Sequence, residues 1–295
     1  MSQPTLSGLA AGIAVDLESS SVTHRKSAKG VLEQDADLKL AELRKDYADL
    51  HTALFEATQV YRRLCAPRLV RHGDFEIASE TFAARHLPGD FFTMRATGKD
   101  AMLALGDISG KGFAAGMWTA LLLGLLGIHN EPGAEPEAIV AAMNRDLSRA
   151  SIGVPLASLF LGRLDSDNGM LDYCSAGHPP ALLLRADGSL ESLCEGGPLL
   201  GAVPKASYVK GTVELRDGDV LVVYSDGVLE AHNKSDEEFA LDRLEAQVRR
   251  ARGSSAEAIL FSLLGTVQDF VGGYPQADDM SLVVARRLMH RSGVQ

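Results

Sequence analysis

The sequence predicts an α+β sandwich, in which many short antiparallel strands and a smaller number of helices share one core. Short apolar segments, bounded by glycine or by Asp-Gly and Asn-Gly turns, recur over much of the chain. Two pairs of longer helical segments interrupt them. With 46% apolar residues, the 295-residue chain has enough apolar side chains for a full core. Without repeats or an internal linker, we expect one domain over residues 67–288.

The region before this domain has a different pattern. Residues 1–30 are rich in serine, alanine and glycine without sustained periodicity, so we expect a disordered tail. We predict a regulatory helix over residues 31–66, and Pro67 ends it. Its apolar or small residues alternate steps of three and four, as the a and d positions of a heptad repeat do. They are Leu40, Leu43, Tyr47, Leu50, Leu54, Ala57, Tyr61 and Leu64.

Two interpretations of this helix stay open. It is either an amphipathic helix packed on its own domain or one strand of a dimeric coiled coil. The strictness of the repeat and its position before the domain favour the coiled coil. At the other end of the chain, residues 289–295 are expected to form a short tail.

Within the domain, the pattern predicts strands and helices in a definite order. The strands are expected at residues 75–84, 91–96, 101–105, 157–163, 170–175, 181–185, 190–193, 208–215, 220–224 and 280–285. The helices are expected at residues 114–128, 137–149, 238–250 and 256–271. Pro136 marks the start of the second helix.

Composition and charge exclude several classes of protein. The formal net charge of −10 argues against binding to nucleic acid or to an anionic membrane surface. No segment is long and apolar enough to cross a bilayer, and no basic segment precedes residues 9–15, so we expect no signal peptide. Cys65, Cys174 and Cys194 have no paired spacing, which disfavours disulfides and a zinc site. A cytoplasmic protein fits these features.

Four aspartates stand where predicted strands or loops end. They are Asp90 in LPGD, Asp107 in GDISGKG, Asp226 in YSDG and Asp278 in DDMS. An isolated Asp-Gly pair is usually a turn, but four carboxylates emerging at one sheet edge would repel one another strongly. Hard divalent cations resolve that repulsion, and a set of oxygen ligands selects Mg²⁺ or Mn²⁺ over zinc. The pattern therefore indicates a carboxylate-rich metal site.

The order of these four aspartate motifs along the chain resembles that of a known protein family. Three further motifs accompany the aspartates: SAGHPP at residues 175–180, GPLLG at 197–201 and YSDGVLEA at 224–231. Together they resemble the metal-dependent (PPM-type) phosphatases of the protein phosphatase 2C superfamily, and more closely its bacterial RsbU/SpoIIE-like branch. The resemblance covers about residues 60–288. It implies a four-layer α-β-β-α sandwich, two antiparallel sheets flanked by helices, with an N-terminal helical or coiled-coil extension.

The resemblance also implies a metal centre and its activity. Its groups would hold two cations, Mn²⁺ or Mg²⁺: Asp90, Asp107, the backbone carbonyl of Ile108, Asp226, Asp278 and Asp279. Asp107 would bridge the cations, and Asp279 would orient water or support a third, weaker metal. The aspartates Asp90, Asp107, Asp226 and Asp278 are thus the expected catalytic residues of a protein-serine/threonine phosphatase. One departure from the family pattern is Pro88, where a second glycine is usual.

The implied substrate is a phosphorylated anti-sigma-factor antagonist of the STAS type, in a bacterial partner-switching pathway. Regulation would act through residues 31–66, by homodimerisation or by an upstream activator protein. Two other functions stay open. One is an interaction protein with a degraded site that only sequesters a partner, against which the intact aspartates count. The other is a metal-dependent hydrolase of a small phosphoester.

Some single residues allow other interpretations. Cys65 and Arg71 have the spacing of a tyrosine phosphatase loop, but Leu64 stands where that motif has histidine. Asp165 begins an Asp-Ser-Asp sequence like that of an aspartyl-phosphate nucleophile, although a hairpin turn is the better interpretation. His178 either organises its turn or lines the approach of the substrate. We expect Lys111 either to contact substrate phosphate, or to remain solvated or cap the next helix region.

Overall fold

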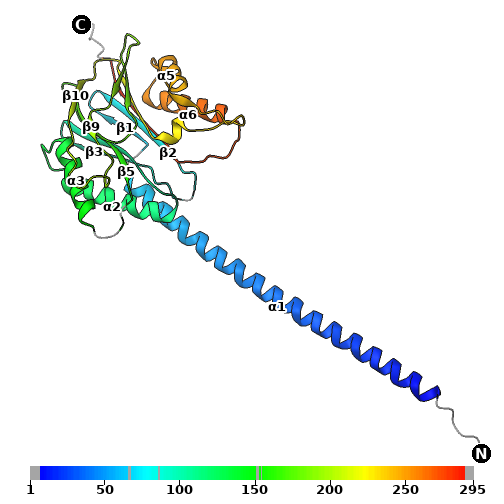
Figure 1. Ribbon diagram of the computed structural model, residues 1–295. Coiled ribbons are helices and arrows are strands. Elements are labelled where there is room, and N and C mark those ends of the chain that lie inside the picture. Colours follow the sequence, from blue (N-terminus) through cyan, green and yellow to red (C-terminus); the bar gives the residue numbers. More distant parts are fainter. Residues whose placement is uncertain (1–6, 66–67, 86, 151–152, 154, 290–295) are drawn as a thin grey trace, which may run out of the picture. The chain divides into compact units, whose positions relative to one another are not determined.

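The computed structural model describes residues 7–65, 68–85, 87–150, 153 and 155–289, with side chains from residue 34 onward. The chain divides into two compact units, Met1–Glu56 and Ala57–Gln295. The boundary between the units falls within the first helix, α1 (Ser7–Leu64), which is drawn in blue in Figure 1.

Helix α1 begins at Ser7, whereas the sequence predicted a tail up to residue 30. That prediction relied on the absence of apolar periodicity, but periodicity reports the packing of a helix rather than its backbone conformation. No proline interrupts the backbone hydrogen bonds between Ser7 and Leu64. The heptad residues Leu40, Leu43 and Tyr47 are exposed along this helix.

The second unit contains two sheets of six strands each. The first sheet has the order β1 (Leu69–His72), β2 (Phe75–Phe82), β12 (Met280–Arg287), β11 (Val220–Tyr224), β7 (Ala181–Leu184) and β8 (Leu190–Leu193). The second has the order β10 (Gly211–Glu214), β6 (Met170–Ala176), β5 (Ala157–Asp165), β4 (Asp100–Ile108) and β3 (Phe91–Thr97). A short strand β9 (Gly196–Gly197) pairs in parallel with β6, and all other pairs are antiparallel.

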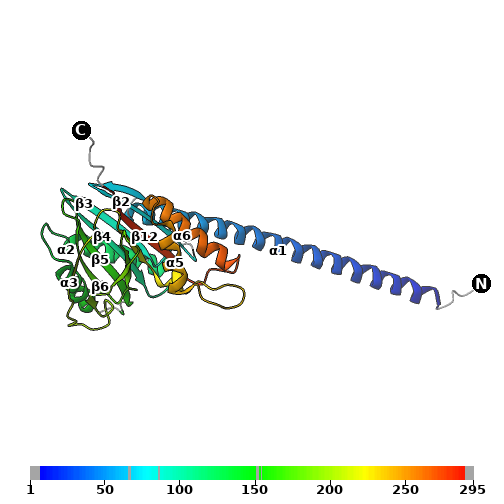
Figure 2. The same ribbon diagram turned by 90° about the horizontal axis from the view of Figure 1, so that it is seen from above.

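Two helix pairs cover the outer faces of the sheets (Figures 1 and 2). Helices α2 (Phe113–His129) and α3 (Pro136–Arg149) pack on the second sheet, and α5 (Ala240–Ala251) and α6 (Ala256–Val271) pack on the first. A single-turn helix, α4 (Asp226–Leu229), follows β11. The predicted four-layer α-β-β-α sandwich is therefore confirmed.

The alternation of strand side chains explains the layers. On β11, Val220 and Val222 face the α5–α6 layer, whereas Leu221 and Val223 face the other sheet. A strand covered on both faces needs apolar residues at every position, and all five residues of β11 are buried. The core thus has three layers of side chains, one between the sheets and one beneath each helix pair. No helix among the described residues has the length and hydropathy needed to cross a membrane.

A candidate metal centre

Both sheets contribute aspartates to one site. Asp90 directly precedes β3 and Asp107 lies near the end of β4, and these strands pair with Phe91 opposite Gly106. Asp226 begins α4 directly after β11, and Asp278 lies two residues before β12, with Tyr224 opposite Leu282 in that pair. Antiparallel pairing places the end of one strand beside the beginning of its neighbour. Each sheet therefore supplies two of the four predicted aspartates.

Asp90 is the most deeply buried of these carboxylates, with 1% of its surface exposed. The Ser225 hydroxyl donates a hydrogen bond to Asp90 Oδ2 over 2.7 Å. Burial and then the neighbouring charge of Asp107 raise the pKa of Asp90 well above its usual range. The Tyr61 hydroxyl, from the last turn of α1, donates to the backbone carbonyl of Asp90. The loop that carries Asp90 is thus fixed both at its side chain and at its backbone.

Asp107 and Ile108 meet the Asp90 loop at a glycine. A Cβ atom at Gly89 would lie 2.9 Å from the carbonyl oxygen of Ile108 and 3.4 Å from Asp107 Oδ1. The loop after Ile108 turns through Gly110, at a φ of 117°, which side chains rarely allow. Burial and then Asp226 raise the pKa of Asp107 to about 6. Glycine at position 89 therefore lets the carbonyls of Ile108 and Gly110 and the Asp107 carboxylate approach the Asp90 loop closely.

Asp226 and Asp278 form the more open part of the site. Asp226 is exposed, yet partial desolvation and then the charge of Asp278 raise its pKa. Lys111 Nζ lies 2.9 Å from Asp278 Oδ2 and also donates to the carbonyl of Ala277. A Cβ atom at Gly227 would lie 2.0 Å from the carbonyl oxygen of Asp279, so only glycine fits there. The α4 turn and the segment before β12 are therefore in close contact.

Asp279, which the resemblance implied as a further metal-site residue, is held by the backbone. Its side chain is buried, and each of its oxygens accepts a backbone hydrogen bond. The donors are the N–H groups of Ala84, at 2.7 Å, and Gly89, at 2.6 Å. These bonds tie the segment before β12 to the loop of Asp90. The geometry shows that this carboxylate fastens two loops, and its role toward water or a third metal stays a prediction.

The donor set fits hard divalent cations. Asp90, Asp107 and Asp226 each have a raised pKa with another aspartate among its causes, which indicates an excess of negative charge. Carboxylates and a backbone carbonyl are the ligands that Mg²⁺ and Mn²⁺ prefer. Among the described residues, no group of three or more His, Cys, Asp or Glu side chains is arranged so that it could hold a metal ion. The aspartates thus affect one another's ionisation, although their carboxylates are not gathered into a set of metal ligands.

Several residues with alternative interpretations lie apart from this chemistry. His178 is buried, hydrogen-bonded to Ser158 at 2.8 Å, and burial lowers its pKa to about 3. It is neutral and organises its turn, because a buried ring cannot line an open approach. Burial raises the pKa of Cys65, and Arg71 pairs with Glu76 at 3.2 Å, so the pair forms no tyrosine phosphatase loop.

Asp165 and Lys111 also find structural partners. Asp165 pairs with Lys99 at 2.8 Å and accepts from the backbone of Asp167 in the β5–β6 hairpin. The prediction of a hairpin turn there is correct. The ion pair of Lys111 with Asp278 sets this lysine at the edge of the aspartate cluster rather than free in solvent.

The sequence analysis missed the groups that support the aspartates. Ser225 bonds Asp90, and the backbone N–H of Ser281 donates to the Ser225 hydroxyl at 2.9 Å. Both serines stand inside the motifs that identified Asp226 and Asp278, so their positions were visible but their partners were not. Thr119 of α2 donates to the carbonyl of Gly89 at 3.3 Å. No local pattern marks that contact, because it joins a helix to a loop about thirty residues earlier in the chain.

Comparison with known proteins identifies similar chains. The family model for stage II sporulation protein E (SpoIIE) matches residues 97–288. Protein IcfG of Synechocystis sp. is 27% identical over 232 residues, which cover 69% of this chain and 36% of that protein. Phosphoserine phosphatase RsbU of Bacillus subtilis is 24% identical over 237 residues, covering 78% of this chain and 69% of RsbU. The chain thus spans only about a third of the length of IcfG.

A solved structure has the same fold. The SiaA-PP2C domain of Pseudomonas aeruginosa superposes with a TM-score of 0.72, covering 81% of this chain and 96% of that domain. Its sequence is 18% identical, so this likeness concerns the fold.

Proposed function

Because the chain belongs to the SpoIIE family of PPM-type phosphatases, we propose that it is a metal-dependent protein-serine/threonine phosphatase. One observation carries this proposal: Asp90, Asp107 and Asp226, which come from both sheets, each have a pKa that burial and then a neighbouring aspartate raise. Such a cluster is unfavourable unless cations neutralise it. Two divalent cations, Mn²⁺ or Mg²⁺, are the cofactors that suit these oxygen ligands.

The chain's own groups have distinct tasks in this reaction. When bound, the cations supply Lewis-acid activation of the phosphoryl group and of water. Asp90, Asp107, Asp226, Asp278 and the carbonyl of Ile108 hold them. Ser225 fixes the orientation of the Asp90 carboxylate. Lys111 places a positive charge beside Asp278, where it can pair with phosphoryl oxygens. His178 donates no proton, because it is buried and neutral.

The substrate is a phosphoserine or phosphothreonine of a small regulatory protein. We assign it to the class of anti-sigma-factor antagonists of the STAS type, in a partner-switching pathway. The similarity to phosphoserine phosphatase RsbU supports this assignment. The net charge of −10 agrees with a protein substrate rather than a nucleic acid.

Regulation acts through α1. Its exposed heptad residues, among them Leu40, Leu43 and Leu50, form an apolar stripe that a second copy or an activator helix would bury. The last turn of α1 contacts the metal loop, since Tyr61 donates to the carbonyl of Asp90. A displacement of that turn would therefore alter the position of a metal-binding residue.

The test is hydrolysis of p-nitrophenyl phosphate and of phosphoserine peptides in Mn²⁺, in Mg²⁺ and in EDTA. We expect metal-dependent turnover that Asp226→Ala abolishes while circular dichroism and the melting temperature stay those of a folded protein. Asp242→Ala, an exposed aspartate on α5, is the matched control and should retain full activity. An active Asp226→Ala protein would refute the assignment.

The outcome also separates the other functions. Metal-dependent turnover of small phosphoesters that exceeds phosphopeptide turnover by orders of magnitude would indicate a small-molecule hydrolase. No turnover under any condition, including with α1 paired in a full-length dimer, would indicate an interaction protein. Light scattering on the full chain tests the dimer directly: a monomer at high concentration rules out homodimerisation through residues 31–66.

A further inference from the structure

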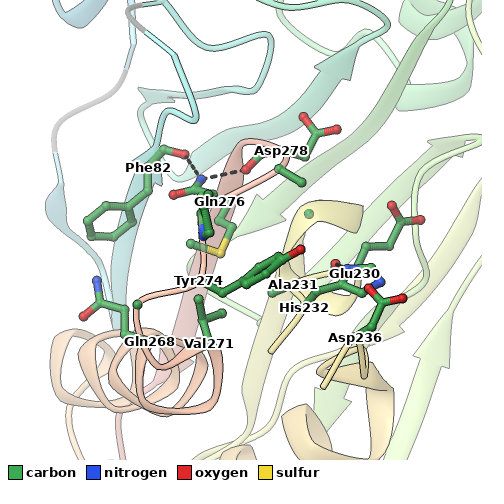
Figure 3. A pocket seen from close by; sticks show the side chains of 15 residues that line it. Phe82, Glu230, Ala231, His232, Asp236, Gln268, Val271, Tyr274, Gln276 and Asp278 are labelled. Carbon is green, nitrogen blue, oxygen red and sulfur yellow. Dashed lines mark hydrogen bonds between the residues drawn. The ribbon is translucent and has the colours of Figure 1, made fainter. Parts of the chain in front are cut away.

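A separate cavity adjoins the aspartate cluster. Its volume is about 500 Å³, within the range of ligand pockets. It lies between the segment that follows α4 and the connection from α6 to β12 (Figure 3). Gly227 and Asp278 line it, so the cavity shares a wall with the proposed metal centre. A group bound in the cavity would therefore lie close to a phosphate bound by the aspartates.

The walls of this cavity differ in character. Phe82 and Val271 provide apolar surface on one side, and Glu230 and Asp236 stand on the opposite side, with the Tyr274 ring between them (Figure 3). No lysine or arginine is among the described residues that line the cavity. We call this set of five residues the acidic subsite. It combines an aromatic and aliphatic surface with two carboxylates.

The two carboxylates are available to a ligand. Within the described part of the chain, neither Glu230 nor Asp236 has a side-chain hydrogen bond or an ion pair with a cationic group. The nearest candidate, His232, donates instead from Nδ1 to the Glu230 carbonyl, 2.6 Å away, and its Nε2 lies 4.0 Å from Glu238. The remaining titratable groups on the cavity wall are Tyr274 and Asp278. Neither Tyr274 nor Asp278 supplies a positive charge that would neutralise Glu230 and Asp236.

The walls are also fixed in place before any ligand binds. Gln276 Nε2 donates to the carbonyls of Phe82, at 2.9 Å, and Asp278, at 2.6 Å, which holds the α6–β12 connection against β2. On the other side, Asn233 Oδ1 accepts from the backbone N–H groups of Ser235 and Glu237. These bonds close the loop that carries Asp236. A preformed cavity loses little entropy when it is filled.

We propose that the acidic subsite receives an arginine side chain of the phosphoprotein substrate, close in sequence to the phosphorylated residue. This inference rests on the proposed phosphatase function. Arginine suits the subsite because its aliphatic stem packs on apolar surface and its planar head stacks on an aromatic ring. Its five donors form a fork that satisfies two carboxylates at once. Lysine has a more strongly hydrated charge and one donor centre, so it fits less well.

Paired phosphoserine peptides test the proposal. One series carries a single arginine, moved from three residues before the phosphoserine to three after it, and the other carries glutamine at the same positions. We expect one position at which arginine raises kcat/KM by about tenfold over glutamine. In the double variant Glu230→Gln with Asp236→Asn, that preference should fall to near unity. Asp269→Asn, an exposed carboxylate on α6 outside the cavity, should keep the preference.

A charge reversal separates recognition from a structural effect. Glu230→Lys should reverse the preference, so that a peptide with glutamate at the selected position becomes better than the arginine peptide. A general loss of activity that is equal for all peptides would overturn the proposal. So would an arginine preference that persists unchanged in the double variant.

A binding measurement keeps this inference distinct from the proposed function. Fluorescence anisotropy of the labelled peptides in EDTA requires no turnover. Arginine-dependent binding that disappears in the double variant supports the subsite even if no phosphatase activity is found. Conversely, turnover without any difference between arginine and glutamine peptides supports the phosphatase and refutes the subsite.

Discussion

The aspartate cluster has a buried side and an open side, and they are built differently. On the buried side, Asp90 and Asp279 are enclosed and accept hydrogen bonds from Ser225 and from the backbone of Ala84 and Gly89. On the open side, Asp226 is exposed and Asp278 is half-buried beside Lys111. The same residue type thus fastens loops on one side and faces solvent on the other.

For the neighbours Asp278 and Asp279, this difference predicts that one mainly binds metal and the other mainly stabilises the fold. A buried carboxylate with two protein donors leaves those donors unpaired when it is removed, which costs folding free energy. An exposed carboxylate beside others of the same charge contributes little to stability and mainly provides a ligand. Asp278 and Asp279 are neighbours in the sequence, so they give a direct comparison of the two roles.

The largest effect is expected for Asp279→Ala. Removing this carboxylate leaves the buried N–H of Gly89 without an acceptor, and we expect the free energy of unfolding to fall by about 3 kcal/mol. Urea denaturation in EDTA measures this without a contribution from metal. Asp279→Asn keeps one acceptor oxygen and should lose less. A fully stable Asp279→Ala protein would show that the buried side has no structural role.

Asp278→Ala should affect metal binding instead. We expect Mn²⁺ to bind about 100-fold more weakly, since a ligand is lost, while the free energy of unfolding in EDTA changes by less than about 0.5 kcal/mol. Isothermal titration calorimetry and the same denaturation series provide the two values. A large loss of stability with unchanged metal affinity would reverse the assignment of the two neighbours.

The pH dependence of metal binding tests the link between the two sides, because Asp107 lies between them. Metal ligands must be ionised, and the pKa of Asp107 is about 6. We therefore expect the Mn²⁺ affinity to fall as the pH decreases through that value, with protonation of Asp107 contributing about tenfold per pH unit below it. Asp107→Asn should weaken this dependence and remove most of the affinity. An affinity that stays constant between pH 7 and pH 5 would contradict the prediction.

The stability of the metal-free protein should show the opposite trend. The folded pKa of Asp107 lies above its ordinary value of 3.8. Between these two values the folded state binds more protons than the unfolded state. The contribution of Asp107 to the free energy of unfolding therefore decreases as pH rises through this window, as denaturation in EDTA can measure.

The smallest expected effect concerns the contact between α1 and the buried side. Tyr61→Phe removes the hydroxyl that donates to the Asp90 carbonyl, and we expect the Mn²⁺ affinity to fall about fivefold. Tyr47→Phe, an exposed tyrosine on the same helix, is the matched control and should not change it. Equal metal affinities for both variants would mean that α1 does not act on the metal loop.

Much of the fold could be predicted because apolar patterns are local. The predicted strands at residues 220–224 and 280–285 match β11 and the greater part of β12, since both are apolar on both faces. Strand β1 was missed because its residues are exposed or half-buried, so no apolar pattern marks it. Helix α4 was missed because a single turn is too short for a period to be visible.

The aspartates of the site could be predicted as well, but their separate roles could not. Adjacent positions such as Asp278 and Asp279 look alike in sequence. Only the folded chain brings Asp279 to Ala84, 195 residues earlier, and Ser225 to Asp90, 135 residues earlier. These contacts depend on loop positions at the ends of both sheets, about which local periodicity carries no information.

The position of β12 has a consequence for biosynthesis. This strand lies between β2 and β11 and pairs with both, so the first sheet is interrupted until residues 280–287 are in place. Because chains emerge from the ribosome with the N-terminal residues first, the edge of β2 that pairs with β12 stays unpaired for most of translation. The Asp90 loop likewise lacks Ser225 and Asp279 during that time. A nascent chain that ends before β12 would therefore expose an unpaired strand edge and lack enzymatic activity. Premature release would then yield an aggregation-prone product rather than an unregulated phosphatase.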